Sequence, residues 1–223
     1  MINKQYYFLS VFILALTFIF NLAIGQKIVE VRDEAFHKPV FQNKYIRLLN
    51  VVIPPGDTSL YHRHYLPSAF VFLEKTDIGM QDLGAKPGQL ITTIGQTWFN
   101  GYEKGAQIHR AWTNDRKVNL HAIDIEFLDF NSTDQDLILN HPSIELVSDS
   151  APVRIYRLRI IKGENLKLQL NNNPVVIIPY TGDVKMGRSR LNRSSYLWWD
   201  KSSLEISGSK TEEVLCYLYE IRT

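Results

Sequence analysis

Most of the chain consists of short apolar segments separated by turn sequences. After residue 26 the apolar positions do not recur at the three-to-four-residue spacing of an amphipathic helix. Instead, runs rich in Val, Ile, Leu, Phe and Tyr alternate with Gly- and Pro-containing turns such as 54–57 and 181–183. The runs cover residues 45–53, 69–73, 118–127, 153–161, 175–180 and 214–221. This pattern predicts many short strands and an all-β fold, a sandwich or barrel.

The first 25 residues follow a different pattern, which is typical of a secretory signal peptide. Lys4 precedes the uncharged run 8–20, and the small residues Ala23 and Gly25 stand just before Gln26. The order of basic, apolar and small residues predicts cleavage after residue 25. The apolar run is shorter than the ~20 residues that span a bilayer as a helix. If it is counted up to residue 24 it is longer, so an uncleaved anchor is the alternative. We expect a secreted or periplasmic protein without membrane association after cleavage.

An internal repeat divides the remaining chain into two units. A shift of 107 residues lays 51–56 on 158–163 and the apolar run beginning at 69 on that beginning at 176. A shift of 94 residues lays 120–126 on 214–220. Repeated supersecondary patterns of this kind indicate duplicated structural units. We predict one β-unit over residues 26–150 and a second over 151–223.

Composition excludes several classes of protein. With 45% hydrophobic and 12% aromatic residues, the 223-residue chain has enough apolar surface to fold, which argues against disorder. The balance of 25 basic and 23 acidic side chains gives no support to a nucleic-acid partner. Cys216 is the single cysteine, so no intrachain disulfide forms, and its apolar neighbours predict a buried, inert thiol.

Charge differs between the two predicted units. Residues 26–150 carry 12 basic and 16 acidic side chains, and residues 151–223 carry 12 basic and 7 acidic ones. Opposite net charges can draw the units together within one molecule or across a homodimer. Two solvated surfaces of different composition explain the same numbers.

The strongest chemical signal is the segment that begins at Gly56 and reaches His62-Arg63-His64 after five residues. Side chains alternate across a strand, so the two imidazoles project from one face about 6–7 Å apart. Two imidazoles on one face can share a metal ion. Taken alone, the pattern also fits two surface histidines.

This segment resembles the first motif of the cupin superfamily, and Gly105 with His109 and Asn114 resembles the second motif. The resemblance implies two tandem cupin-type jelly-roll barrels, a bicupin. It also implies that His62, His64 and His109 bind one divalent transition metal, which is Fe, Mn, Ni, Cu or Zn. The second motif departs from the pattern, since both of its gaps are one residue longer and its proline is absent. The glutamate of the first motif is missing too, because Ser68 or Ala69 occupies its position.

Three neutral imidazoles leave a divalent ion its full charge, which favours small anionic, chelating ligands. Known three-histidine cupins include several dioxygenases. The resemblance therefore implies an exported metal-dependent cupin that acts on a small anionic metabolite, with dioxygenase-like oxidoreductase chemistry as one option. The alternative is a non-catalytic bicupin that binds a small acid or sugar. The sequence names no catalytic residue beyond the metal ligands, and it contains no phosphate-binding loop for an organic cofactor.

The repeat places Gln169, Asn171 and Ser203 at the positions of the three histidines. None of these side chains is a good ligand for a transition metal. The resemblance therefore implies that the second unit is a degenerate cupin domain without metal.

The other histidines have less specific surroundings. His121 lies in the apolar run 118–127, where it could be a fourth ligand, a partner of a ligand or a hydrogen-bonded core histidine. His37 and His141 each stand near a proline in loop-like sequence, so we expect both to be exposed.

Several aromatic and polar residues flank the third histidine. Trp98, Tyr102 and Trp112 could form the wall of a small-molecule site or pack in the core. Asn114 could hydrogen-bond a ligand histidine or occupy an ordinary turn. Further along, the basic segment 185–193 precedes the aromatic segment 196–199. Together they could form an anion or sugar site, or a solvated loop followed by a core strand.

Overall fold

The computed structural model describes residues 27–130, 138–171, 173–187 and 189–222. The predicted signal peptide, residues 1–25, lies outside the described residues. Within them the chain is all-β, with one short 3₁₀ turn, as the sequence predicts. No helix among the described residues has the length and apolarity needed to cross a membrane.

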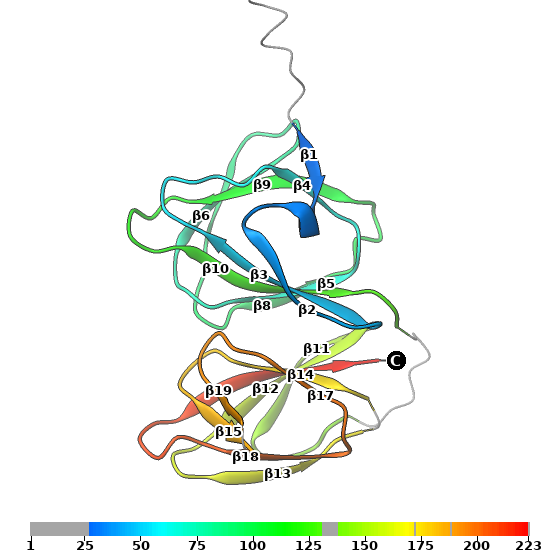
Figure 1. Cartoon of the computed structure of the whole chain (residues 1–223), viewed down its shortest axis with the longest axis vertical. Helices are drawn as coiled ribbons and strands as arrows, with labels where there is room; N and C mark the ends of the chain where they lie inside the picture. Colours follow the sequence, from blue (N-terminus) through cyan, green and yellow to red (C-terminus); the bar gives the residue numbers. More distant parts are fainter. Residues whose placement is uncertain (1–26, 131–137, 172, 188, 223) are drawn as a thin grey trace, which may run out of the picture.

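The first unit consists of two five-stranded sheets that face each other (Figure 1). One has the strand order β1-β4-β9-β6-β7 and the other β2-β3-β10-β5-β8. The elements are β1 (Ile28–Glu30), η1 (Val31–Asp33), β2 (His37–Gln42), β3 (Ile46–Ile53), β4 (Tyr61–His64), β5 (Ser68–Phe72), β6 (Asp77–Asp82), β7 (Gly88–Ile91), β8 (Thr97–Asn100), β9 (Gln107–Thr113) and β10 (Leu120–Phe127).

The second unit has a five-stranded sheet, β11-β12-β19-β14-β17, and a four-stranded sheet, β13-β18-β15-β16. Its strands are β11 (Ile144–Ser150), β12 (Val153–Ile160), β13 (Asn165–Gln169), β14 (Val175–Pro179), β15 (Val184–Met186), β16 (Ser189–Leu191), β17 (Leu197–Trp199), β18 (Ser203–Ser207) and β19 (Val214–Ile221). In both units the two sheets remain separate and do not join into a closed barrel.

The two units have the same topology. The order β2-β3-β10-β5-β8 corresponds to β11-β12-β19-β14-β17, and β4-β9-β6-β7 corresponds to β13-β18-β15-β16. The 107-residue shift also relates an irregularity of the strands. The β-bulge between Pro39 and Phe41 recurs between Leu146 and Ser148. Among the described strands, β1 has no counterpart in the second unit. It lies parallel to β4, with Val29 opposite His62.

The boundary between the units in the structure differs from the boundary predicted from the sequence. The sequence-based boundary at residue 150 assigns 144–150 to the first unit, but these residues form β11 and pair with β12 of the second. Leu139 also packs in the core of the second unit. The second unit therefore includes Leu139 as well as β11. The apolar repeat used for the prediction started at β12 and did not reveal the edge strand that precedes it.

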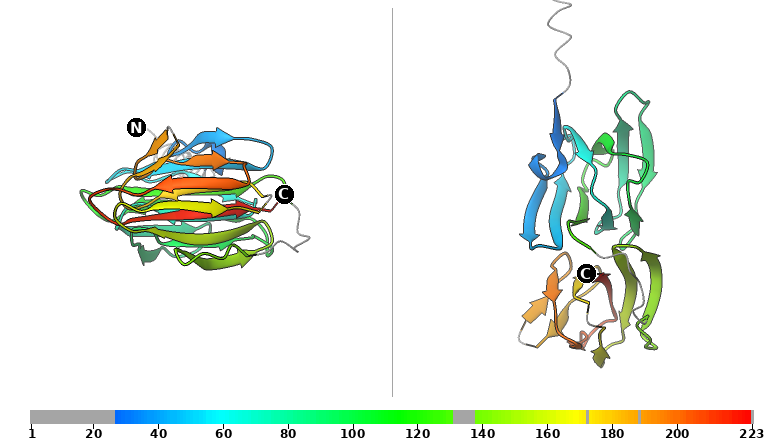
Figure 2. Two further views of the ribbon diagram at one scale, coloured as in Figure 1. Left: turned by 90° about the horizontal axis from the view of Figure 1, so that it is seen from below. Right: turned by 90° about the vertical axis from the view of Figure 1, so that its right-hand side faces the viewer.

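The units pack against each other through one five-stranded sheet of each, β2-β3-β10-β5-β8 of the first unit and β11-β12-β19-β14-β17 of the second (Figures 1 and 2). The facing surfaces of β3, β5 and β10 and of β12, β14 and β19 share a core that includes Leu48, Ile125, Ile155 and Tyr219. Tyr217 Oη donates a hydrogen bond across the boundary to the Gly95 carbonyl, at 2.7 Å. Burial of apolar side chains therefore holds the units together, and Arg193 of the second unit adds an ion pair with Glu74 of the first, at 2.9 Å.

The interiors of the two units differ in their contents. Apolar side chains fill the second, among them Leu168, Leu204 and the fully buried Cys216. The interior of the first unit has fewer apolar residues. The rest of the space between its two sheets contains a group of histidines and a cavity, which we describe below.

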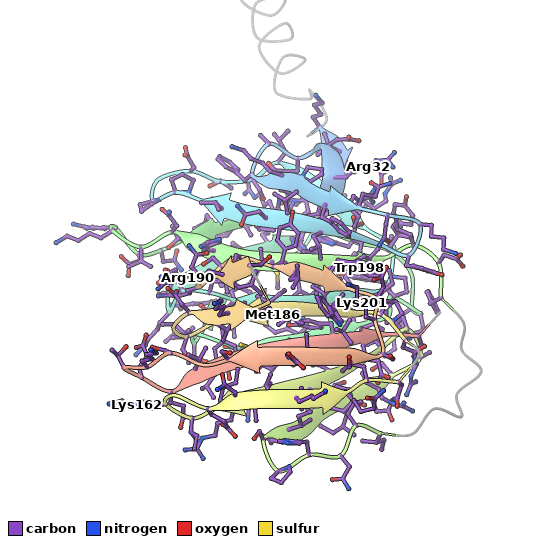
Figure 3. The ribbon with its side chains drawn as sticks, turned by 60° about the horizontal axis from the view of Figure 1, so that its bottom comes forward. Arg32, Lys162, Met186, Arg190, Trp198 and Lys201 are labelled. Atoms are coloured by element: carbon purple, nitrogen blue, oxygen red, sulfur yellow. The ribbon has the colours of Figure 1, made fainter. Side chains whose placement is uncertain are left out.

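The basic and aromatic segment of residues 185–199 splits into two parts. Arg190, on β16, pairs with Asp183 of its own unit at 2.7 Å. Trp198, on β17, stacks on Phe41 of the first unit with ring centroids 5.9 Å apart. Figure 3 labels both side chains on the second unit. Tyr196 and Trp198 thus belong to the contact between the units, whereas Leu197 and Trp199 pack against the core of the second unit.

Candidate metal site

Three predicted histidines lie together inside the first unit. On β4, His62 and His64 point inward and are 0% and 2% exposed, whereas Arg63 between them is exposed. His109, on the neighbouring antiparallel strand β9, lies directly opposite His62. The ring centroid of His109 is 4.6 Å from that of His62 and 5.0 Å from that of His64. The period-two alternation of β4 and the register with β9 therefore bring all three rings into one group.

A fourth histidine, His37, belongs to the same group. The expectation that His37 is exposed is wrong: it begins β2, pairs with Val51 and is 5% exposed. Its ring centroid lies 4.4 Å from that of His62. One nitrogen each of His37, His62 and His64 lie within 4.8 Å of one another, an arrangement that could hold a metal ion.

Hydrogen bonds fix the outer nitrogens of two of these rings. His37 Nδ1 donates to Glu34 Oε2 at 2.8 Å, and His62 Nδ1 donates to the Leu60 carbonyl at 2.9 Å. In both rings the hydrogen bond leaves Nε2 as the nitrogen with a free lone pair. Although burial raises the pKa of the Glu34 carboxyl, its hydrogen bond with His37 brings the pKa below its ordinary value.

Three ring nitrogens of the cluster are buried without a hydrogen-bond partner. His62 Nε2, His64 Nδ1 and His109 Nδ1 have no hydrogen bond among the described residues. Burial lowers the pKa of His109 to about 4 and moves the pKa values of His62 and His64 further down. The imidazoles are therefore neutral at pH 7. Buried neutral imidazoles with free lone pairs fit a transition metal, which binds only the deprotonated nitrogen.

The buried carboxyl group of Asp124 lies next to His64. Asp124 Oδ2, on β10, lies 3.7 Å from His64 Nδ1, and Asp124 is fully buried. Burial raises the pKa of this carboxyl well above its ordinary value. Two residues further along the strand, Glu126 instead forms an ion pair with Arg47 at 2.6 Å.

His37, His64 and His109 border a cavity of about 170 Å³ inside the first unit. Most of its wall is apolar, with Trp98 packed against Phe72 at a ring centroid distance of 5.0 Å. Its polar lining residues are His37, His64, Asn100, Tyr102, Gln107 and His109. No acidic or basic side chain apart from histidine is among its lining residues, all of which the structure describes. A molecule inside would meet imidazoles, a few uncharged polar groups and a mostly hydrocarbon wall.

Tyr102 lines both this cavity and a more open, outer depression of about 750 Å³, as do Asn100 and Gln107. Its ring stacks on His64, with centroids 5.8 Å apart. Its backbone has φ +56°, a conformation that residues other than glycine rarely adopt. Of the aromatic residues expected in a pocket wall, Trp98 and Tyr102 are in the wall.

Trp112 and Asn114 have other roles. The Trp112 indole covers Gly79 on the adjacent strand β6 and is not among the cavity-lining residues. Its Nε1 donates to Asn114 Oδ1 at 2.8 Å, and Asn114 also bonds Asp77. Asn114 thus ties the end of β9 to Asp77 of β6, and it has no hydrogen bond to a histidine among the described residues.

The two remaining histidines lie outside the cluster. His121 is half-buried and hydrogen-bonds Asn50 at 3.0 Å, as expected for a satisfied structural histidine. His141 is half-buried instead of exposed, and its Nδ1 accepts a hydrogen bond from the Ser143 amide.

The predicted counterparts in the second unit form no such cluster. Gln169 is exposed, and Asn171 donates to Glu220 at 2.8 Å. The Ser203 carbonyl accepts a hydrogen bond from Trp199. The space between the sheets is filled with leucine, isoleucine and methionine instead.

Sequence reasoning missed His37 because Pro39 made its surroundings look like a loop. The repeat could have revealed it. A shift of 107 residues lays His37 on Ile144, which packs against the core of the second unit, and both residues begin equivalent edge strands.

No family model matches the chain, and no curated protein matches it. Several solved structures, however, match the chain. The nickel(II) complex of the bacterial pirin YhhW from Escherichia coli matches with a TM-score of 0.60 and 16% identity, covering 84% of this chain and 91% of that one.

Two further structures cover most of the chain. A cupin 2 conserved barrel domain protein from Leptotrichia buccalis matches with a TM-score of 0.54 and 10% identity, over 91% of this chain and 94% of that one. Quercetin 2,3-dioxygenase from Acinetobacter baumannii matches with a TM-score of 0.53 and 10% identity, over 81% and 75%. At these identities the likeness concerns the fold. The chain therefore has the two-unit fold of pirin-like and cupin proteins, as the resemblance of its histidine motif predicted.

Proposed function

We propose that this chain is an exported, metal-dependent cupin-type enzyme that acts on a small anionic molecule. One divalent transition metal would bind to His62, His64 and His109 in the first unit, with His37 as a fourth nitrogen donor. The observation that carries the proposal is the set of buried imidazole nitrogens without partners, beside an apolar cavity. Leaving such groups unpaired costs free energy in a purely structural core, and a metal ion would satisfy them.

The donor set favours a transition metal over calcium or magnesium, which prefer oxygen ligands. Two nitrogens bound at ~2.1 Å to one ion stand roughly 3–4 Å apart. The nitrogens of His37, His62 and His64 all lie within 4.8 Å of one another, so small side-chain rotations would bring them to a common ion. When bound, the metal would supply Lewis-acid chemistry or, if it is redox-active, oxygen activation.

The cavity defines the kind of substrate. An anionic head would bind at the histidine end, because no lysine or arginine lines the cavity and a metal held by imidazoles keeps its positive charge. An apolar or aromatic body would pack against Trp98 and Phe72. Asn100 and Gln107 offer polar contacts near the outer depression.

Oxygenase-like chemistry is the form of this activity that we propose first. Support comes from the shared fold with a quercetin 2,3-dioxygenase and with a pirin whose structure holds nickel(II). The alternative is a non-catalytic protein that captures a small acid or sugar in the same cavity. The cavity lining favours this alternative in one respect, because it holds no carboxylate that could act as a general base.

Elemental analysis of the purified protein tests the proposal. After reconstitution with Fe, Mn, Ni, Cu or Zn we expect close to one ion per chain, and loss of binding in both His62→Ala and His109→Ala. His141→Ala is the control, because it removes a histidine of the second unit. Absence of metal in the wild-type protein would overturn the proposal.

Oxygen uptake with quercetin and with simpler aromatic enols as probes then distinguishes the two functions. An enzyme consumes oxygen in the presence of a substrate, and the His62→Ala variant does not. A binding protein shows only a ligand-dependent rise in melting temperature and leaves the ligand unchanged.

A further inference from the structure

The Glu34 side chain contacts two parts of the histidine cluster at once. It follows η1 and is 3% exposed. One carboxylate oxygen, Oε2, accepts hydrogen bonds from His37 Nδ1 at 2.8 Å and from the Phe36 amide at 2.7 Å. The other, Oε1, accepts one from the Leu60 amide at 3.2 Å. A single buried carboxylate thus ties the beginning of β2 to the segment that enters β4.

The Leu60 peptide carries this connection on to His62. Its N–H group is held by Glu34, and its carbonyl accepts the hydrogen bond from His62 Nδ1 at 2.9 Å. Fixing the peptide therefore fixes the acceptor that His62 uses. In both His37 and His62 the hydrogen bond occupies Nδ1 and leaves Nε2 for a ligand.

The second unit shows what this turn looks like without a histidine cluster. A shift of 107 residues lays Glu34 on His141 and His37 on Ile144. The backbone bond from the His37 amide to the Glu34 carbonyl, at 3.0 Å, recurs from Ile144 to His141 at 2.9 Å. The hydrogen bond from the Phe36 amide to the Glu34 side chain recurs as one from Ser143 to the His141 ring.

The turn itself therefore does not require a glutamate, since an imidazole accepts the same amide hydrogen bond in the second unit. Glu34 differs from His141 because its side chain accepts two further hydrogen bonds, one from His37 and one from the Leu60 amide. A carboxylate is suited to them because it accepts several hydrogen bonds and donates none when ionised.

We propose that Glu34 is the positioning residue of the metal site, and that its carboxylate holds His37 and His62 with Nδ1 protonated and Nε2 directed at a common ion. This rests on the proposed metal-binding function. Because β1 and η1 lead directly into Glu34, the N-terminal segment of the first unit becomes a structural part of the site. Partners of this kind typically change metal affinity by about 10–100-fold.

Glu34→Gln is the test variant, since it keeps the size of the side chain and removes the carboxylate. We expect the affinity for Co²⁺ and Ni²⁺, measured by competition with a chromophoric chelator, to fall by about 10–100-fold. The visible absorption bands of bound Co²⁺ should also shift, because the ligand geometry changes. His141→Gln is the matched control at the equivalent turn, and it should leave both measurements unchanged.

A second measurement needs no metal and no variant. Long-range ¹H–¹⁵N NMR of the metal-free wild-type protein reports the tautomer of each histidine, and we expect His37 and His62 to be protonated at Nδ1. Protonation of both at Nε2 would overturn the positioning role, as would unchanged metal affinity and Co²⁺ spectrum in Glu34→Gln. If the wild-type protein binds no metal, the proposed function fails, and the tautomers still decide what Glu34 does.

Discussion

His64 Nδ1 faces Asp124 Oδ2 across 3.7 Å, and neither atom has a hydrogen-bond partner among the described residues. Both side chains are buried between the sheets of the first unit, at 2% and 0% exposure. Unpaired polar groups in such a position cost roughly 1–3 kcal/mol each. Buried polar groups that break the usual rule of satisfaction are typical of functional sites.

The His64–Asp124 pair leads to a prediction about stability without metal. His64→Leu replaces an unpaired imidazole with hydrocarbon, so the free energy of unfolding of the metal-free protein should rise or change by less than ~1 kcal/mol. Ile53→Ala, in the apolar core of the same unit, should lower it by about 2–5 kcal/mol. Urea titration of both variants measures the difference. A loss in His64→Leu as large as that in Ile53→Ala would show that the imidazole stabilises the metal-free fold.

A second prediction concerns Tyr102, which lines both the inner cavity and the outer depression. Tyr102→Ala should join the two spaces and speed the removal of bound metal by a chelator several-fold. Tyr102→Phe keeps the ring stacked on His64 and should change this rate little. Stopped-flow measurement of metal release compares the variants. Equal rates in Tyr102→Ala and the wild-type protein would show that metal leaves by another route.

Gly79 and Trp112 give a third prediction. A Cβ atom at position 79 would overlap the Trp112 ring, whereas at Gly88, on the neighbouring strand, the nearest atom is 3.8 Å away. Gly79→Ala should therefore lower the free energy of unfolding by about 1–3 kcal/mol through overpacking. Gly88→Ala should change it by less than ~1 kcal/mol. Thermal denaturation followed by tryptophan fluorescence tests the pair, and equal effects would contradict the close packing of the indole.

The fourth prediction concerns Cys216, which is fully buried in the second unit. Burial raises the pKa of the Cys216 thiol to about 12, compared with ~8.5 for a free cysteine. The native thiol should therefore resist alkylation at pH 8 and react only after unfolding, as mass spectrometry can show.

The same shift in pKa affects stability at high pH. Because the folded state holds this proton more tightly than the unfolded state, the contribution of the thiol is complete below pH ~8.5 and is lost as the pH rises towards 12. Between pH 9 and about 11, the wild-type protein should lose more stability than Cys216→Ala does. Parallel curves for the two proteins would contradict the raised pKa.

A fifth prediction concerns export. We expect the full chain to leave the cytoplasm and to lose about 25 residues, because residues 1–25 have the order of a signal peptide. Cell fractionation with mass spectrometry of the N-terminus measures both. Recovery of the intact chain in the membrane fraction would support the uncleaved anchor instead.

Local sequence determined much of this protein. Apolar runs and turns established the all-β class, because strands need only a two-residue periodicity and a suitable turn. The 107-residue shift predicted the duplicated topology that β3 and β12 display at the same registers. The alternation in β4 predicted that His62 and His64 share a face, and the cupin resemblance added His109.

Tertiary structure alone decided the rest. Pairing with β12 assigned β11 to the second unit, because β11 carries too few apolar residues for its sequence to be read as a strand of that unit. The entry of His37 into the cluster, its bond to Glu34 and the position of Asp124 behind His64 depend on how β2, β4 and β10 stack. A buried polar side chain acquires its role from the groups that face it, and those groups come from strands far apart in the chain.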